Sequence, residues 1–305
     1  MEVVIAGAGS IGLLFGSFLA EKGHQVSFLV RREEQAAHLG KEGVKRYRNG
    51  VEVFRQHVRV IRGVNEIPVD ALIIVATKTR GLDQLLQTLH EHPNPILFIQ
   101  NGLSHYELAM ELNREFRSLA FATVEHGAER KDDSSVAHHG VGVTKIAVAK
   151  GDEADFKWLA MLHSEEFPIE FHADAEQLLL RKVIINCLIN PLTAILLQKN
   201  GELVRNVHSN QLFEQLYDEI MVVFPEMKLE LSFDRVAEVC QRTAANTSSM
   251  LTDRLQGNRM EIDTIVSALI RKAEMRGGAL PMLAVFEKLL VAMDEAGGLK
   301  CIWAD

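Results

Sequence analysis

Residues 1–12 read MEVVIAGAGSIG, and this stretch decides the fold. Residues 3–6 are a continuous apolar run, as expected for a parallel strand buried on both faces. The run leads into a G-x-G-x-x-G sequence over residues 7–12, and residues 11–21 then have the apolar spacing of a helix. A strand, this glycine spacing and a helix in that order are typical of a dinucleotide-binding fold.

Each glycine of the motif has its own expected role. Gly7 permits a tight turn, Gly9 lets the backbone approach a pyrophosphate, and Gly12 lets the helix pack closely on the strand. The start of the helix offers free N–H groups and a positive dipole end to the phosphates. The alternative is a plain glycine turn between strand and helix. We predict a phosphate-binding loop made of Gly7, Ala8, Gly9, Ser10, Ile11 and Gly12.

The residues after the second expected strand, 26–30, indicate which dinucleotide is bound. An NAD enzyme usually has an acidic residue here, about 20 residues beyond the motif, to bind the ribose 2′-hydroxyl. This chain has Arg31 and Arg32 instead, followed by two glutamates. A guanidinium suits a 2′-phosphate, and the missing carboxylate removes a repulsion. We predict NADP(H), with a solvated charged turn as the alternative reading of the arginines.

The first half of the chain continues the alternation of strand and helix. Further strands are expected at residues 71–76, 96–99, 119–124, 144–149 and 169–171. This pattern predicts an α/β, Rossmann-type, doubly wound parallel sheet. Lys78 and Gln100-Asn101-Gly102 follow two of these strands, at the edge where such sheets bind ligands. A surface lysine and a simple turn are the alternatives for these two positions.

Strand signals nearly vanish from about residue 173. Amphipathic helical patterns replace them at residues 175–199, 211–223, 233–241, 262–275 and 282–294. We predict two domains: a NADP-binding Rossmann domain over residues 1–172 and an all-α substrate and catalytic domain over residues 173–305.

Composition excludes several functional classes. The net charge is -8 over 305 residues, which argues against a general nucleic-acid surface. The three cysteines form no C-x-x-C pair and no H-E-x-x-H is present, so we expect neither a disulfide framework nor a metal site. The longest apolar stretch, residues 183–197, contains Asn186, Asn190 and Pro191 and is too short to span a bilayer. We expect a cytoplasmic protein.

The most informative segment is residues 181–191, RKVIINCLINP. Within its apolar part, Lys182, Asn186 and Asn190 recur at every fourth position, so on a helix they form one stripe. A polar stripe on an otherwise buried helix must face partners, water or a ligand, because unpaired burial is costly. The alternative is that the asparagines cap neighbouring elements while Lys182 reaches solvent. Pro191 removes a helical hydrogen bond to Cys187.

The stripe fits the chemistry of ketone reduction. Adding hydride to a ketone develops negative charge on the carbonyl oxygen, which needs a proton and an electrostatic partner. The ammonium of Lys182 can supply both. Asn186 and Asn190 can exchange hydrogen bonds with the substrate without adding charge. Spacing alone would not select Asn246-Thr247-Ser248-Ser249, which looks like a helix N-cap, or Glu261.

Taken together, these motifs resemble the ketopantoate (2-dehydropantoate) reductase family. The likeness covers essentially the whole chain and is most specific in the all-helical half. It rests on the glycine motif, Lys78, Gln100-Asn101-Gly102, Lys182-x-x-x-Asn186-Cys187-x-x-Asn190-Pro191, Asn200-Gly201-Glu202-Leu203, Asn246-Thr247-Ser248-Ser249-Met250 and Glu261-Ile262-Asp263.

The resemblance implies NADPH-dependent reduction of 2-dehydropantoate to (R)-pantoate, on the route to pantothenate and coenzyme A. It assigns Lys182 as the catalytic general acid and Glu261 as the active-site glutamate, beside the cofactor. It assigns Asn186, Asn190, Asn101 and Ser249 to the substrate, with Ser249 on its carboxylate. On the cofactor side it assigns Lys78 and Asn101 to the nicotinamide end and Arg31 to the 2′-phosphate.

Two other readings stay open. One is a related NADP-dependent dehydrogenase that acts on a different 2-oxo or hydroxy acid. The other is a non-catalytic NADP(H) sensor, although a sensor has no need of a proton donor such as Lys182. The sequence does not give the oligomeric state, and the helical half could supply the surface of a homodimer.

Overall fold

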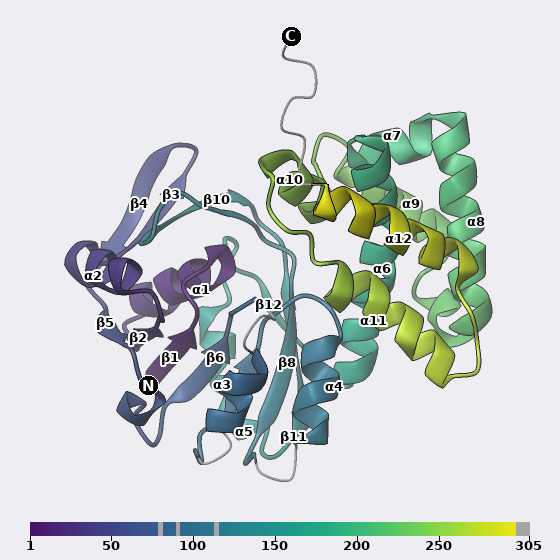
Figure 1. The fold of residues 1–305 in the computed structure, drawn as a ribbon. Helices are drawn as coiled ribbons and strands as arrows, with labels where there is room; N and C mark the ends of the chain where they lie inside the picture. Colours follow the sequence, from purple (N-terminus) through teal and green to yellow (C-terminus); the bar gives the residue numbers. More distant parts are fainter. Residues whose placement is uncertain (79–81, 90–91, 113–115, 297–305) are drawn as a thin grey trace. The chain divides into compact units, whose positions relative to one another are not determined.

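The computed structural model describes residues 1–78, 82–89, 92–112 and 116–296 (Figure 1). Its internal contacts divide the chain into two compact units. The α/β unit comprises Met1–Asn101 and His105–Leu179, and the helical unit comprises Gly102–Ser104 and the chain from Leu180 onward.

An eight-stranded sheet forms the centre of the α/β unit. Its strand order is β12-β11-β8-β7-β6-β1-β2-β5. The strands are β1 (Glu2–Ala6), β2 (Gln25–Leu29), β5 (Arg59–Ile61), β6 (Leu72–Val75), β7 (Ile96–Phe98), β8 (Leu119–Val124), β11 (Thr144–Lys150) and β12 (Ile169–His172). The six strands from β5 to β8 are parallel, in the doubly wound order of a dinucleotide-binding domain. The predicted fold class is therefore confirmed.

One pair in this sheet departs from the expected parallel arrangement. β11 lies antiparallel to β8, with Thr144 opposite Val124. A parallel return would require a crossover that carries the chain back to the opposite edge of the sheet. Here the intervening residues form two strands of another sheet, so the chain re-enters from the same edge and runs antiparallel.

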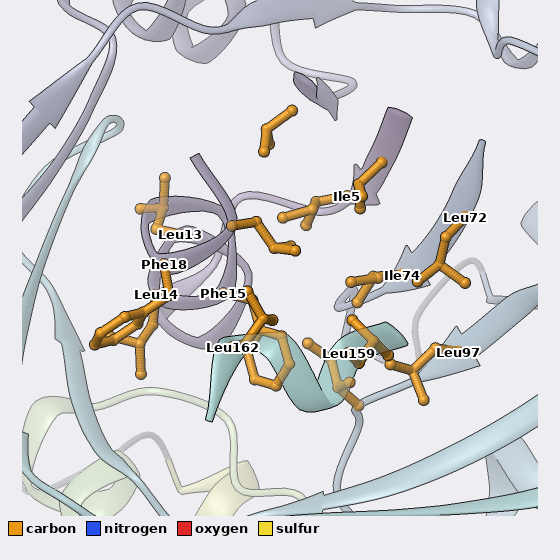
Figure 2. Close-up of a cluster of buried hydrophobic side chains, with 14 of the residues drawn as sticks. Ile5, Leu13, Leu14, Phe15, Phe18, Leu72, Ile74, Leu97, Leu159 and Leu162 are labelled. Carbon is orange, nitrogen blue, oxygen red and sulfur yellow. The ribbon is translucent and has the colours of Figure 1, made fainter. Parts of the chain in front are cut away.

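The hydrophobic core lies between the sheet and the helices that cover it. Figure 2 shows Phe15 and neighbouring side chains of α1 (Ser10–Glu21) packed with side chains from β1, β6 and β7 and with Leu159 and Leu162 of η2 (Trp158–Leu162). Gly16 lets α1 come close, because a Cβ there would lie 2.3 Å from the Phe28 ring. The unit also contains α2 (Glu33–Glu42), η1 (Val64–Glu66), α3 (Leu82–Leu89), α4 (Ser104–Glu111) and α5 (Ala154–Lys157).

A second, four-stranded sheet was not predicted. Its order is β4-β3-β10-β9, formed by β3 (Val44–Arg48), β4 (Val51–Gln56), β9 (Gly127–Arg130) and β10 (Ser135–Gly140). Asn49 and Gly50 join β3 to β4 with φ angles of 51° and 79°. An Asn-Gly pair between short strands is a strong hairpin signal, so this hairpin could have been found from the sequence.

The second sheet packs on α1 through a buried arginine. The Arg46 guanidinium lies 3.7 Å from the centre of the Phe18 ring and donates two hydrogen bonds, of 2.9 and 2.8 Å, to the carboxylate of Glu21. The Arg46 side chain is almost fully buried, so both its charge and its planar face are matched.

The helical unit contains the five predicted helices, with small shifts at their ends. They are α6 (Ala175–Leu196), α8 (Val207–Val223), α9 (Phe233–Arg242), α11 (Ile262–Met275) and α12 (Pro281–Glu295). The structure adds η3 (Pro225–Leu229) and two short helices, α7 (Asn200–Arg205) and α10 (Ser249–Gln256), which are too short to show a clear period. α6 is long and apolar enough to cross a membrane by length and composition, but most of it is buried inside the protein.

His105 makes the α/β unit sensitive to acid. Its ring is almost fully buried in α4, with ring centres of Phe98 and Phe121 at 5.9 and 5.7 Å. Burial lowers the pKa of His105 to about 3. Because an unfolded histidine has a pKa near 6.5, acid favours the unfolded chain. This stabilising contribution is complete above pH 6.5 and is lost as the pH falls toward 3.

We expect His105→Phe to flatten the pH dependence of stability. Between pH 7.5 and pH 5 the natural protein should lose about 2 kcal/mol more unfolding free energy than the variant, because the phenyl ring of the variant has no nitrogen to protonate. Urea unfolding at several pH values, followed by tryptophan fluorescence, measures the difference. Parallel pH profiles for the two proteins would contradict the prediction.

Candidate active site

The glycine loop lies where the order of the strands reverses. β1 pairs with β2 on one side and with β6 on the other, and the loop leaves the carboxyl end of β1. The Gly7 N–H donates a 3.1 Å hydrogen bond to the carbonyl of Leu29 at the end of β2. Such a switch point is where open α/β sheets bind their ligands.

The three glycines of the loop meet different constraints. Gly7 has a φ of 111°, and a Cβ there would lie 2.9 Å from the backbone nitrogen of Thr77. A Cβ on Gly12 would lie 2.1 Å from the carbonyl oxygen of Gly7. A Cβ on Gly9 would have no atom of the described structure within 4 Å, so a ligand can approach the backbone there.

The start of α1 is suited to an anion. Gly9 is its N-cap residue, and no side chain in the described chain caps it. The first turn has no acidic residue, so the positive end of the helix dipole is not neutralised locally. The loop therefore fits the pyrophosphate of a dinucleotide in backbone shape and in charge.

The two arginines after β2 have different surroundings. Arg32 forms an ion pair and hydrogen bond with Asp133. Arg31 is exposed, and its guanidinium makes no ion pair or hydrogen bond within the part of the chain that the structure describes. The sequence left open which arginine meets the phosphate, and the structure leaves Arg31 as the one whose charge is not already matched.

Gln35, which no motif of the sequence singled out, supports the glycine loop. Its side chain is buried in α2, and Nε2 donates to the carbonyl of Ala8 at 2.9 Å and to that of Asp133 at 3.3 Å. It therefore links the loop to the turn between β9 and β10. A single glutamine in a short helix carries no sequence signal of such a role.

Two further polar side chains lie at the ends of β6 and β7. Gln100 donates from Nε2 to the carbonyl of Thr77, which leaves its Oε1 as an acceptor. Gln100 Oε1 and Thr77 Oγ1 are buried and have no hydrogen-bond partner among the described residues. Lys78 and Asn101, the predicted nicotinamide-side residues, follow them directly and are exposed.

In the helical unit, the structure places the predicted polar stripe along α6. Lys182 and Asn186 are half-buried, and Asn190 is only 4% exposed. Asn190 Nδ2 donates to the Ser249 hydroxyl at 3.4 Å. The structure thus brings together two of the residues assigned to the substrate, from segments 59 residues apart.

The segment around Ser249 begins α10. Ser248 is the N-cap, accepting a 3.1 Å hydrogen bond from the Leu251 N–H, as the helix-cap reading predicted. Ser249 is the first residue of the helix and is exposed. Glu261 is the N-cap residue of α11 and is half-buried, and its predicted pairing with Lys182 remains a prediction.

Gly102 belongs by its contacts to the helical unit. It has a φ of 92°, and a Cβ would lie 2.2 Å from the carbonyl oxygen of Thr264. The next N–H, of Leu103, donates to that same carbonyl at 3.0 Å. Gly102 and Leu103 are therefore held against the first turn of α11, and only glycine fits at position 102.

The predicted site residues thus fall into two groups, one in each unit. Within the described ranges, no three His, Cys, Asp or Glu side chains are arranged to hold a metal ion. Cys187 and Cys240 are buried free thiols, and burial raises the pKa of Cys240 to about 12. Cys301 lies outside the described residues.

A doubly wound sheet with a glycine loop at its switch point, followed by an all-α unit, defines a Rossmann-type NAD(P)-dependent oxidoreductase. Two family models match the chain: Ketopantoate reductase PanE/ApbA over residues 3–151 and Ketopantoate reductase PanE/ApbA C terminal over residues 174–294. The chain belongs to the ketopantoate reductase family, as the motifs predicted.

Relatives of similar length support this membership. The 2-dehydropantoate 2-reductase of Listeria innocua is 33% identical over 297 residues, covering 96% of this chain and 97% of the relative. That of Bacillus subtilis is 34% identical over 279 residues, covering 91% and 92%.

Solved structures agree on the fold. The probable 2-dehydropantoate 2-reductase of Bacillus subtilis has a TM-score of 0.85 at 32% identity, covering 96% of this chain and 100% of its own. D-mandelate dehydrogenase, solved with NADH and anilino(oxo)acetate, has a TM-score of 0.82 at 24% identity, covering 97% and 99%. At that identity the second likeness shows the fold alone.

Two alanine substitutions in the loop should affect different properties, one the NADPH affinity and the other the stability. Gly9→Ala should leave the melting temperature unchanged but weaken NADPH binding about tenfold or more, because its methyl group occupies the approach to the backbone. Gly12→Ala should destabilise the protein by about 1–3 kcal/mol, because its methyl group overlaps the Gly7 carbonyl. Thermal melts and NADPH fluorescence titrations measure both. Wild-type NADPH affinity in Gly9→Ala would show that phosphates do not approach there.

Proposed function

We propose that this chain reduces 2-dehydropantoate to (R)-pantoate with NADPH, in the route to pantothenate and coenzyme A. The observation that carries the proposal is that the chain matches both ketopantoate reductase models and has Lys182, Asn186 and Asn190 in one stripe on α6. Relatives named 2-dehydropantoate 2-reductase cover more than 90% of the chain.

Lys182 acts as the general acid in this proposal. When bound, the reduced nicotinamide supplies the hydride. The Lys182 ammonium hydrogen-bonds to the substrate's 2-oxo oxygen and gives it a proton as negative charge develops there. Glu261, half-buried like Lys182, stabilises the charged form of the lysine.

The substrate's carboxylate and hydroxyl groups bind further along α6. Asn190 and Ser249 already meet across a hydrogen bond, and Ser249 opens α10, whose first turn has no acidic residue. An amide, a hydroxyl and the positive end of a helix dipole favour a carboxylate. Asn186, one turn closer to Lys182, contacts the hydroxyl end of the substrate, and Asn101 completes the contacts.

For the cofactor, we propose NADP(H) with its 2′-phosphate on Arg31. Arg31 is exposed and its charge is not matched by a described carboxylate, whereas Arg32 is held by Asp133. Lys78 and Asn101 would meet the nicotinamide end. We further propose that the enzyme is cytoplasmic and needs neither nucleic acid nor membrane, in keeping with a net charge of -8.

The first experiment follows NADPH consumption with 2-dehydropantoate. We expect turnover that Lys182→Ala reduces about 100- to 1,000-fold while NADPH still binds, because the variant loses the proton donor. Lys199→Ala, at an exposed lysine just after α6, is the matched control and should keep full activity. Intact NADPH binding without turnover would rule out 2-dehydropantoate as the substrate, and other 2-oxo acids would then be assayed.

A second experiment separates the two arginines. Arg31→Ala should raise the NADPH dissociation constant about tenfold or more and leave that of NADH nearly unchanged, because only NADPH carries the 2′-phosphate. Arg32→Ala should have a smaller effect, because its charge is already paired. The opposite ranking would assign the phosphate to Arg32, and equal NADPH and NADH affinity in the natural protein would contradict the cofactor preference.

A further inference from the structure

A row of hydrogen bonds connects the start of α10 to the C-terminal part of α6. The Leu251 N–H donates to Ser248 Oγ at 3.1 Å, and Ser248 Oγ lies 2.7 Å from Thr193 Oγ1. Thr193 Oγ1 in turn lies 2.9 Å from the carbonyl oxygen of Ile189 and 3.0 Å from that of Asn190.

The groups at the two ends of this row, two carbonyls and one backbone N–H, determine which hydroxyl donates in each bond. The Thr193 hydroxyl has one hydrogen, and the carbonyls can only accept, so Thr193 donates to them. Ser248 must then donate to Thr193, and its oxygen accepts from Leu251. Thr193 is fully buried and Ser248 is 6% exposed, so both bonds lie almost entirely out of contact with bulk solvent. The link is fully satisfied in one arrangement only.

This link lies next to two residues proposed to bind substrate. Ser249 directly follows Ser248, and Asn190 offers its own carbonyl to Thr193. The 3.4 Å hydrogen bond from the Asn190 amide to the Ser249 hydroxyl therefore runs beside the buried link. A sliding or rotation of α10 against α6 would change that separation.

The far end of α10 has a separate attachment. Arg254 Nη1 donates to the carbonyl of Ala194, and also to that of Ile195 at 3.4 Å. These carbonyls belong to the last turn of α6, past the substrate residues. This attachment is separate from the Thr193–Ser248 link, which adjoins Asn190 and Ser249.

We propose that Thr193 and Ser248 are positioning residues that fix the Asn190 amide and the Ser249 hydroxyl at the spacing that binds the substrate carboxylate. The inference rests on the proposed function. Both groups bind the carboxylate before and during hydride transfer, so their displacement weakens substrate binding in both states. Lys182 lies eleven residues before Thr193, about 16 Å along the helix, so the proton donor is much less affected.

The test replaces Thr193 by valine, which keeps the branched shape and removes the hydroxyl. We expect the substrate KM to rise about tenfold or more, with kcat changed much less and the NADPH dissociation constant unchanged. Thr193→Ser should restore the KM, because it restores the hydroxyl. The measurements are steady-state kinetics on the 2-oxo acid that the natural protein reduces.

Thr243→Val is the matched control. Thr243 also bonds a helix carbonyl, that of Val239 at 2.7 Å, and accepts from Asn200 Nδ2 at 2.9 Å, but it contacts neither α6 nor α10 through these bonds. It should lower the melting temperature about as much as Thr193→Val and leave the KM unchanged. An unchanged KM in Thr193→Val, or an equal rise in Thr243→Val, would overturn the proposal.

Amide hydrogen exchange at Leu251 gives a readout that needs no substrate. Thr193→Val should speed this exchange about tenfold, because the Ser248 oxygen that accepts this N–H is no longer held, and Thr243→Val should not. If the natural protein reduces no 2-oxo acid, the proposed function fails separately. Unchanged exchange in Thr193→Val would still overturn the link itself.

Discussion

The close approach of α1 to the end of β1 is the constraint on which the cofactor side depends. Gly12 lies against the carbonyl of Gly7, and Gly16 lies against the ring of Phe28. A side chain at either position would push the helix away from the sheet. Because the helix stays close, its uncapped start points its N–H groups at the switch point. Gly9, the one glycine of the G-x-G-x-x-G motif with no atom near an added Cβ, lies beside it.

The second sheet supports the residues around the glycine loop. The turn between β9 and β10 supplies Asp133, whose carboxylate pairs with Arg32 and whose carbonyl accepts from Gln35. Gln35 also holds the carbonyl of Ala8 in the glycine loop. One turn therefore supports the loop and takes up the charge of one arginine, which leaves the charge of the other for a ligand.

In the helical unit, α6 carries polar side chains although most of the helix is buried. An unpaired polar group in such a place is costly, so each needs a partner. Asn190 and Thr193 find theirs in the two serines that begin α10. The same short helix thus satisfies the buried groups of α6 and presents an exposed serine at a helix start, where an anion is favoured.

The sequence by itself determined the fold class, the glycine loop, the five long helices and the stripe on α6, because these depend on local spacing. A buried strand, a helix period and glycine positions are all visible within a dozen neighbouring residues. It did not reveal the role of Gln35, the Thr193–Ser248 link or the pairing of Arg32 with Asp133. Those depend on partners 27 to 101 residues away, and only the folded chain brings such partners within hydrogen-bond distance.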